Sequence, residues 1–552
     1  MRDMSKLVSE DECFIVKDTK DLLKIPQNVR HLKVLKGGDV KCSDLLNLSK
    51  YRKLRTLLCD LSLKKESKTG NAVMEKWCTE LLCMRVMVCS SISKWGLPGS
   101  LSNMKHLRYL KILDSSLCKG LPSEFCCLYN MQIFYAMKWS IEDIPSGFVK
   151  LINLQKFESK KYQFHHEEGA TNKEQRRLFK FKDYNGESPP RGFHAQNMPD
   201  ITSLDLVTWD NVKSISSSMN SEQIHSHDCN DSTFLSLSDV SINCCKNLSS
   251  LYQFLQPGYV PFIKKIMISN CFSLESIPAE RFVDLHFLEV LCVCRCPKIK
   301  SQHLFAPSLK KLDLENSGNL GGKIECSSLT ILYLSHNPLE SIELQMWNLP
   351  LLQELKISYC SSLAIIKDSE PIYPDLSLGR FPKLTHLTIW CCDKLETIDD
   401  LIYLPAIESI EITSCGLLSL PADRFGSFPR LKDLEIVWCK NLNWHCGMLL
   451  PSFLQKLWFQ GCGDFSAWFP SCLKKLTSLE ELKVCDYECI VSVPGHLWRS
   501  NLKSLKGLKF RNCPKLQSIG GPDAIAHIKD LFIGGCPELK EVGQPLMKGS
   551  RF

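Results

Sequence analysis

Leucine, isoleucine and valine alternate with polar residues in short segments that recur along the second half of the chain. Three of these segments are Leu352–Cys360, Leu431–Cys439 and Ile528–Cys536. Each has apolar residues at its first, fourth and sixth positions and a cysteine at its ninth. Alternation over so few residues predicts a short strand with one buried face. Because the same spacing returns many times, the sequence predicts a stack of repeats instead of several independent domains.

This spacing is that of the leucine-rich repeat, in which the ninth position is asparagine or cysteine. Consecutive copies are 20 to 26 residues apart, except for a 32-residue step from Leu352 to Leu384 that we expect to hold a loop around Ile372–Pro374. The predicted fold is an α/β leucine-rich-repeat solenoid, a horseshoe with a parallel concave β-sheet and an irregular or short-helical convex side. The thirteen copies begin at Leu237, Ile263, Leu288, Leu309, Leu329, Leu352, Leu384, Ile407, Leu431, Leu454, Leu479, Leu505 and Ile528.

A looser array precedes these copies, and Leu107–Ile112 is its clearest repeat. Residues 159–200 and 213–233 are polar and carry no regular repeat. The expected parts are N-terminal repeats over 26–158, an irregular polar insertion or hinge with one weak repeat over 159–235, C-terminal repeats over 236–545 and a tail over 546–552.

The chain has 29 cysteines, and the repeat frame accounts for the largest group of them. At the ninth position the chain leaves its strand, so a small side chain must pack inside near backbone groups that need partners. Cysteine suits this position as a small, mostly apolar residue with a weak S–H donor, and Ser317 and Asn337 fill it in two other repeats. Unpaired thiols in such number indicate a reducing compartment. The ten cysteines with this predicted structural role are Cys245, Cys271, Cys296, Cys360, Cys392, Cys415, Cys439, Cys462, Cys513 and Cys536.

Residues between the buried positions of each strand, and those just after them, should face solvent on the concave side. Cys292 and Cys485 fall at such positions, and so do several aromatic side chains, which are enriched at interface hot spots. The alternative is that these rings pack on their neighbours or are covered by insertions. We expect the main contact with a partner in the central part of the repeats, from Trp390 to Trp458. The candidate partner-binding residues are Tyr333, Tyr359, His386, Trp390, Trp438, Trp458 and Phe532, with His336 among them.

Two groups look like metal sites in the linear sequence. Cys292, Cys294 and Cys296 are followed by His303, but the repeat frame points the first two outward and Cys296 inward. The second group, His225–Cys229, lies in a serine-rich segment that we expect to be a solvated loop. The chain has none of the common catalytic or calcium-binding motifs. We therefore expect no enzymatic activity, no metal and no cofactor.

The charge balance is mild, because 68 basic and 60 acidic side chains give a net charge of +8. This balance does not indicate a nucleic-acid partner. The first residues are charged and lack the apolar core of a signal peptide. No apolar stretch approaches the roughly 18 residues that span a membrane. We expect a cytoplasmic protein, with the nucleus as a second location.

Several segments resemble those of plant intracellular nucleotide-binding leucine-rich-repeat disease resistance proteins of the coiled-coil class. Ile25–Pro26 followed by Val29–Leu32 is similar to the segment that enters the repeats, and Lys105–Leu110 and Leu128–Gln132 are typical of the same class. Arg2–Phe14 resembles the segment after the family's Met-His-Asp sensor motif. Residues 1–25 are thus interpreted as a remnant of the segment following the winged-helix/sensor region. Repeats that end in cysteine resemble those of cereal receptors.

The chain departs from that family in one respect. Such receptors carry an ATP/ADP switch domain ahead of the repeats, whereas this sequence has no G-x-x-x-x-G-K-[S/T] loop to cradle phosphates. Gly322–Lys323 is followed by Ile324, which has no hydroxyl for Mg²⁺. The resemblance therefore implies repeats that lack the nucleotide-binding domain, and we expect no nucleotide binding.

The resemblance implies a recognition module of plant innate immunity. Its expected partner is a protein bound on the concave face: a pathogen effector, a guarded host protein, or the switch domain of a receptor. An alternative from the adaptor class is a leucine-rich-repeat substrate adaptor of a ubiquitin ligase, for which residues 1–25 are too short to supply an F-box-like segment. A cell-surface receptor ectodomain is disfavoured by the many apparently unpaired cysteines.

Overall fold

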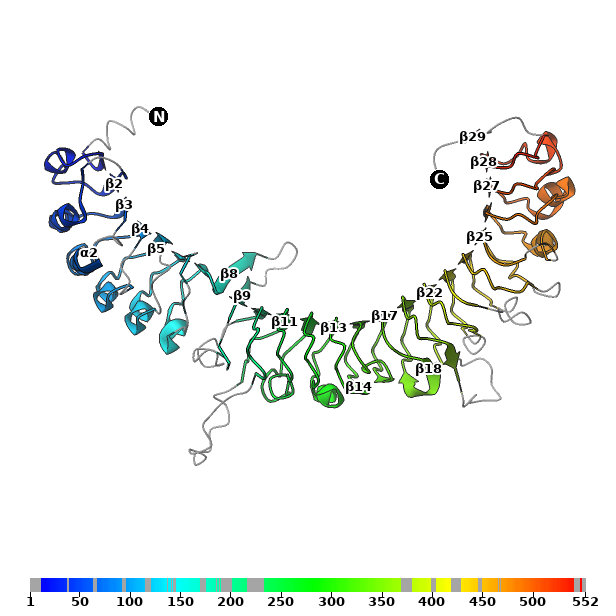
Figure 1. Ribbon diagram of the computed structural model, residues 1–552, viewed down its shortest axis with the longest axis horizontal. Helices are drawn as coiled ribbons and strands as arrows, with labels where there is room; N and C mark the ends of the chain where they lie inside the picture. The colour runs from blue at the N-terminus through cyan, green and yellow to red at the C-terminus, as the bar shows by residue number, and fades with distance from the viewer. Residues whose placement is uncertain are drawn as a thin grey trace. The chain divides into compact units, whose positions relative to one another are not determined.

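The computed structural model describes residues 11–36, 39–62, 67–91, 96–114, 121–136, 138–139, 141, 145–168, 175–184, 186–187, 189, 201–215, 233–368, 380–398, 404–417, 428–444, 449–464, 466, 468–540 and 547–548. The chain forms two compact units, Met1–Leu274 and Glu275–Phe552. Each is an array of short strands joined by return segments (Figure 1). The expected loop around Ile372–Pro374 and the His225–Cys229 group lie outside the described residues.

The first unit contains twelve strands in its described residues. They are β1 (Cys13–Val16), β2 (His31–Val34), β3 (Thr56–Ser62), β4 (Val86–Ser91), β5 (Tyr109–Asp114), β6 (Ile133–Ala136), β7 (Lys156–Ser159), β8 (Tyr162–Glu168), β9 (Gln175–Lys182), β10 (Ser203–Val207), β11 (Asp239–Asn243) and β12 (Lys265–Ser269). Strands β1 to β7 pair in parallel, each with the next along the chain. Strands β9 to β12 do the same.

An antiparallel hairpin interrupts this parallel order. Strand β8 pairs antiparallel with β7 on one side and with β9 on the other. The hairpin lies within 159–235, where the sequence predicted an irregular insertion, so part of that segment continues the sheet. The alternation in Gln175–Lys182 buries Phe179 and Phe181, whose rings are 4.6 Å apart.

The return segments of the first unit are mostly single turns of helix. Helix α2 (Ser67–Glu80) is the longest, and its Trp77 is buried and donates a hydrogen bond to the carbonyl of Leu45. Among the described residues of this unit, 3₁₀ segments are found at Asp21–Leu23, Cys42–Lys50, Gly99–Asn103, Ser123–Cys127 and Ser146–Lys150, and Cys42–Lys50 is the longest of them with nine residues.

The described residues of the second unit contain a parallel stack of eleven strands, each paired with the next. They are β13 (Val290–Cys294), β15 (Lys311–Glu315), β17 (Ile331–Ser335), β20 (Glu354–Ser358), β22 (His386–Trp390), β23 (Ser409–Thr413), β24 (Asp433–Val437), β25 (Lys456–Gln460), β26 (Glu481–Cys485), β27 (Gly507–Arg511) and β28 (Asp530–Gly534). A short strand, β29 (Met547–Lys548), pairs antiparallel with β28. In Figure 1 the stacked strands of this unit line its inner edge, and the return segments lie outside.

The return segments of the second unit add two small parallel sheets. One contains β14 (His303–Phe305), β16 (Lys323–Glu325) and β19 (Trp347–Asn348); the other contains β18 (Ser341–Glu343) and β21 (Ile365–Lys367). Single helical turns are found at Ala279–Asp284, Leu344–Met346, Ser471–Lys475, Leu497–Asn501 and Pro522–Ala524.

The core of the second unit is made by the second and fourth residues of every strand. In β24 these are Leu434 and Ile436, which are 2% and 0% exposed. The pairing places Leu434 beside Ile410 of β23 and Leu457 of β25, so one apolar row runs through the stack. Each repeat buries its leucines only against its neighbours, as in a solenoid. The predicted leucine-rich-repeat fold class is confirmed.

The eighth residue of every repeat in this unit has a positive φ, immediately before the cysteine position. These residues are Arg295, Asn316, His336, Tyr359, Cys391, Ser414, Trp438, Gly461, Asp486, Asn512 and Gly535. The left-handed residue turns the backbone at the end of the strand. In β24 and β25 it precedes Cys439 and Cys462, whose side chains are buried.

Candidate functional site

One ninth-position cysteine, Cys462, has the hydrogen-bonding role that asparagine has in another repeat. Asn337 accepts the backbone N–H of Ser317 at 3.0 Å and donates to the carbonyl of Leu314 at 2.7 Å. Cys462 accepts the backbone N–H of Cys439 at 3.3 Å and donates to the carbonyl of Ile436 at 3.3 Å. The two sets of partners occupy the same repeat positions, so the thiol joins adjacent repeats as the amide does.

All ten cysteines in this frame place Sγ near the carbonyl oxygen two residues earlier, at 3.1 to 3.7 Å. Nine of them are buried, and Cys536 in the last repeat is partly exposed. Burial raises the pKa of the Cys462 thiol well above its usual range, because the thiolate would lose its hydration. These contacts suit a structural role for the thiols.

One cysteine assignment from the sequence was wrong. Cys485 was expected on the exposed face, but it is 3% exposed and burial raises the pKa of its thiol to about 11. Cys485 is the last residue of β26, and the equivalent residues Ser358 and Val437 are also buried. The last strand position is buried in these three repeats and partly or fully exposed in the other repeats of the second unit, so its burial does not follow from the repeat frame alone. Cys292, in the middle of its strand, is partly exposed.

Thiol accessibility therefore gives a first prediction. We expect a maleimide to modify the exposed Cys13 and Cys83 first, and partly exposed cysteines such as Cys292 next. Cys439 and Cys485 should react only when the repeats open, since both are buried. Mass spectrometry of peptides after timed labelling measures the order, and labelling in denaturant supplies the reference rate for each peptide. Equal native rates for Cys292 and Cys439 would contradict the burial assignment.

The described residues contain no group of three or more His, Cys, Asp and Glu side chains that could hold a metal ion. The group suspected in the sequence is split: Cys296 is buried, whereas Cys292 is on the inner face and His303 is in the outer strand β14. His303 lies 3.2 Å from Glu325. None of the helices in the described part of the chain is long and apolar enough to cross a membrane.

The inner face of the second unit is ordered by strand register into straight rows. The middle residue of each strand faces out between the two buried positions, and the pairing places these residues side by side. From β13 to β28 this middle row reads Cys292, Asp313, Tyr333, Lys356, Thr388, Glu411, Glu435, Trp458, Lys483, Lys509 and Phe532. Three of the candidate binding residues, Tyr333, Trp458 and Phe532, therefore share one row.

The rings of the middle row are matched with lysines on neighbouring strands. Lys311 Nζ is 5.1 Å from the ring centre of Tyr333, Lys483 Nζ is 5.1 Å from Trp458, and Lys509 Nζ is 5.1 Å from Phe532. Tyr333 also donates its hydroxyl to Glu354 at 2.8 Å. Cation–π contacts of this kind attract the ammonium group to the ring face and so restrict the motion of these partly exposed rings.

Trp390 is held on two sides. It ends strand β22, and Lys356 Nζ lies 4.0 Å from its ring centre. Its indole N–H donates to Glu411 at 2.9 Å. Trp390 and Trp458 are only partly exposed, so the structure supports in part the alternative that these rings pack on their neighbours.

Two candidate rings occupy the left-handed turn position. Tyr359 has φ +54° and is 49% exposed, and Trp438 has φ +57° and is 41% exposed. Bulky residues are rare in this conformation, which costs about 1 kcal/mol. Tyr359 stacks on His336 of the preceding repeat at 4.9 Å. His386 is exposed, and its Nδ1 is 2.8 Å from the Thr385 hydroxyl.

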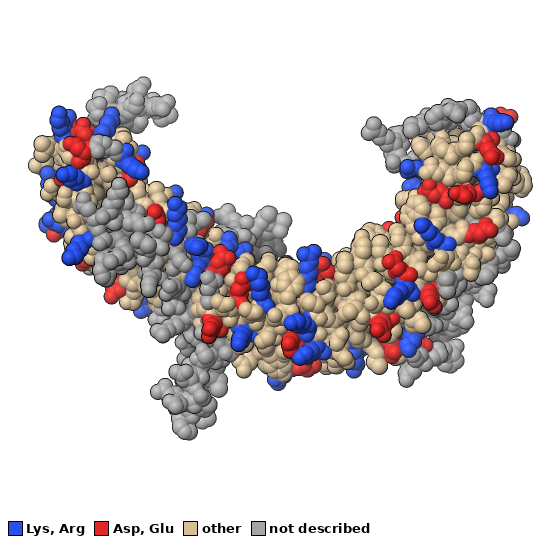
Figure 2. Space-filling model, viewed as in Figure 1, with Lys and Arg blue, Asp and Glu red and all other residues tan. Residues whose placement is uncertain are grey.

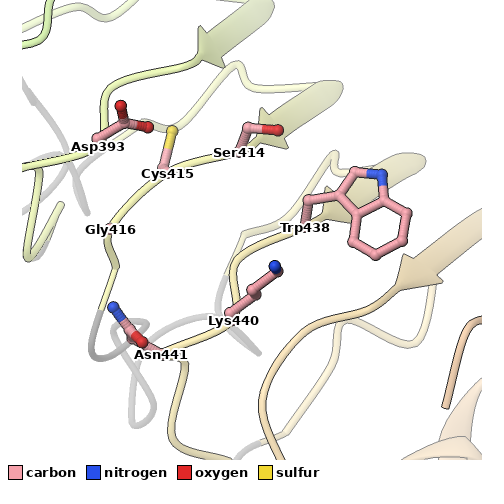
Figure 3. A pocket seen from close by; sticks show the side chains of 7 residues that line it. All are labelled: Asp393, Ser414, Cys415, Gly416, Trp438, Lys440 and Asn441. Atoms are coloured by element: carbon pink, nitrogen blue, oxygen red, sulfur yellow. The ribbon is translucent and has the colours of Figure 1, made fainter.

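The Trp438 ring packs against Gly461 of the next repeat. A Cβ added there would lie 2.6 Å from two carbons of the indole ring, so only glycine leaves room for the ring. Trp438 also borders a shallow hollow of about 560 Å³. Figure 3 shows its lining residues, which are Asp393, Ser414, Cys415, Gly416, Trp438, Lys440 and Asn441.

A second hollow, of about 240 Å³, lies over the middle row between β23 and β26. Glu411, Glu435, Trp458 and Lys483 form its floor. Burial, followed by repulsion from Glu411, raises the pKa of Glu435 to about 7, and Lys483 offsets part of this effect. Sequence reasoning missed these charged residues because it searched for aromatic rings. Reading the fifth residue of successive repeats would have found Glu411 and Glu435 next to each other.

Comparison with known proteins finds relatives with low sequence identity, and they match part of the chain. No family model matches the chain. Disease resistance protein RPP4 of Arabidopsis thaliana is 26% identical over 295 residues, which cover 51% of this chain and 24% of that protein. Protein SUPPRESSOR OF npr1-1, CONSTITUTIVE 1 of the same plant is 25% identical, over 37% of this chain and 16% of that protein. The chain is similar to plant disease resistance proteins over part of its length. It spans less than a quarter of these relatives.

Solved repeat structures are similar at the level of fold alone. The Toll–Spatzle complex of Drosophila contains a chain with a TM-score of 0.46 and 14% identity; the match covers 94% of this chain and 62% of that one. The plant peptide hormone receptor RGFR1 in complex with RGF2 gives a TM-score of 0.29 and 16% identity, over 95% of this chain and 76% of the other. These scores are too low to transfer a ligand or a binding mode.

Proposed function

We propose that this chain is a protein-recognition module of plant innate immunity that binds a pathogen effector or a host protein on the inner face of its second unit. The observation that carries the proposal is the row of partly exposed rings and charges from Tyr333 to Phe532, set in register by parallel strands. Aromatic side chains in such a row provide contact area, and the charges provide selectivity. The similarity to a disease resistance protein supports the immune role.

The surface charge agrees with a protein partner. Figure 2 shows Lys and Arg interspersed with Asp and Glu on the described part of the face in view. A nucleic-acid surface would instead gather basic side chains into a patch or stripe. We propose that the module acts without catalysis, nucleotide or nucleic acid, in the cytoplasm with the nucleus as a second location. In an intact receptor, a switch domain is the further partner of the repeats.

Trp438 gives the sharpest test of this face. A two-hybrid or pull-down screen of pathogen effectors and host immune proteins supplies the partner, and calorimetry measures its affinity. Trp438→Ala should weaken binding by about 2 kcal/mol, because an exposed ring that becomes desolvated is a typical hot spot. The same change should leave the unfolding temperature nearly unchanged, since the ring is 41% exposed.

The matched control is Phe453→Ala, because Phe453 is 61% exposed and lies just before strand β25. This variant should bind normally. Trp390→Ala and Trp458→Ala should also weaken binding, with some loss of stability because both rings contact lysines of neighbouring strands. Full affinity in all three folded tryptophan variants would move the interface away from the inner face of the second unit.

A further inference from the structure

The hollow over the middle row is acidic although the chain as a whole is basic. Its lining includes the carboxylates of Glu411, Asp433, Glu435 and Glu481 and only two ammonium groups, those of Lys456 and Lys483. Lys483 is already engaged, since its Nζ is 4.0 Å from Glu481 and 5.1 Å from the Trp458 ring centre. The hollow therefore has an excess of two negative charges when all six groups are ionised.

Glu411 and Glu435 are direct neighbours in the sheet. They are paired in register on β23 and β24, and adjacent strands are about 4.8 Å apart. Like charges directly opposite each other destabilise a sheet. Burial, followed by repulsion from Glu411, raises the pKa of Glu435 to about 7, and Lys483 offsets only part of this rise. A further cation would stabilise the pair.

Each of the two glutamates has a tryptophan ring beside it. Trp390 donates to Glu411, which orients that carboxylate, and Trp458 follows Glu435 in the row. Each ring also contacts a lysine of a neighbouring strand. Lys356 Nζ lies 4.0 Å from the ring centre of Trp390, and Lys483 Nζ lies 5.1 Å from that of Trp458. The indole N–H of Trp458 is buried and has no acceptor among the described residues. The Trp458 ring therefore contacts Lys483 but donates no hydrogen bond, whereas the Trp390 indole donates one to a carboxylate.

We propose that a lysine or arginine side chain of the protein partner enters the hollow beside Trp458 and lies against the carboxylates of Glu411 and Glu435. This assignment rests on the proposed function, because it names the chemistry that the same face selects. The aliphatic stem of the incoming side chain packs on the indole ring, and its charge offsets the two glutamates. The inner face thus selects a partner with a protruding basic residue.

Binding of a cation to this site depends on pH. The charged groups that face Glu435 are Glu411, Asp433, Lys456, Glu481 and Lys483. The bound cation favours the ionised carboxylate, so binding releases a proton wherever Glu435 is protonated in the free protein. The affinity for a cation should therefore increase as the pH rises through about 7 and decrease as the pH is lowered through the same range. With a pKa of about 7, the ionised fraction grows from about one tenth at pH 6 to nine tenths at pH 8, which corresponds to a roughly tenfold gain.

The probe is the peptide acetyl-Gly-Gly-Arg-Gly-Gly-amide, with citrulline in place of arginine as the neutral control. The full chain is labelled with 5-fluorotryptophan, and the signals of Trp390 and Trp458 are assigned with their Trp→Phe variants. We expect the arginine peptide to shift the Trp458 signal saturably at pH 8 and roughly tenfold more weakly at pH 6. The citrulline peptide should produce no saturable shift. Equal responses to the two peptides, or no saturable response to either, would overturn the proposal.

Glu411→Gln and Glu435→Gln preserve side-chain size and should each abolish the response to the arginine peptide. Their folding is checked by thermal unfolding, which also reports on the carboxyl group without any ligand. The folded-state pKa of Glu435 is raised above its unfolded value, so ionisation destabilises the fold as pH rises from about 4.5 to 7. Glu435→Gln should therefore raise the unfolding temperature at pH 8 relative to the parent chain, but not at pH 4. An unchanged peptide response in both variants would refute the site.

The two proposals fail in different ways. If a partner from the screen loses affinity with Trp438→Ala but not with Glu435→Gln, the inner face binds protein and the basic-residue assignment is wrong. If the arginine peptide binds as described while no variant of the face affects a protein partner, the acidic hollow exists but the proposed function of the face is wrong.

Discussion

Leu434→Asp is expected to unfold the repeats around strand β24 and to destabilise the second unit by more than about 4 kcal/mol. Leu434 is 2% exposed and lies between Ile410 and Leu457, which are equally enclosed. A carboxylate there would have no partner and no water, and burial of an unpaired charge is among the most costly changes in a protein core. Because each repeat is stabilised by its neighbours, the loss should spread along the stack.

Urea unfolding followed by circular dichroism measures the effect. The matched control is Lys440→Asp, which introduces the same side chain at an exposed position of the same repeat and should change stability by less than about 0.5 kcal/mol. We also expect earlier proteolysis near β24 in Leu434→Asp. A midpoint equal to that of the parent chain would show that the apolar row is not the core.

Asn337→Leu should destabilise the second unit by about 3 kcal/mol, since it removes the partners of two buried backbone groups. Asn337 is 3% exposed and bonds the N–H of Ser317 and the carbonyl of Leu314. Leucine has nearly the same size but can satisfy neither group. Urea unfolding of Asn337→Leu and of the parent chain, followed by circular dichroism, measures this loss.

Two further variants separate hydrogen bonding from packing. Asn319→Leu makes the same change at an exposed position nearby and should have little effect. Asn337→Cys should recover much of the loss, because Cys462 already makes the equivalent two contacts in its own repeat. If Asn337→Cys were as unstable as Asn337→Leu, the thiols would not be acting as substitutes for the amide.

The repeat frame was predictable because it depends on local spacing. Leu434 and Ile436 alternate with polar residues, and this alternation is enough to assign the buried face of a strand. Cys439 and Cys462 were placed correctly at the turn for the same reason, because a residue's position in the repeat determines where its side chain points. The hairpin of β8 and β9 was not predictable in this way, since it breaks the period.

The candidate site was harder to predict because it depends on contacts between repeats. Trp390 looks exposed in its own segment, but Lys356 and Glu411 from neighbouring strands flank it. Cys485 looks exposed for the same reason and is buried. The acidic hollow is visible only when the fifth residues of successive repeats are aligned, because Glu411 and Glu435 are 24 positions apart in the sequence and adjacent in the sheet.

The left-handed residue at the end of each strand has a consequence for how such a chain can change. In the second unit this position holds residues as different as Arg295, Cys391, Ser414, Trp438 and Gly461, yet every repeat turns in the same direction there. The backbone thus keeps this geometry with very different side chains at the position, although Gly461 is required beside the Trp438 ring. Single substitutions can alter what the edge displays, in charge, size or aromaticity, while the stack beneath keeps its register. One residue per repeat at this edge can therefore change during evolution while the repeat fold stays the same.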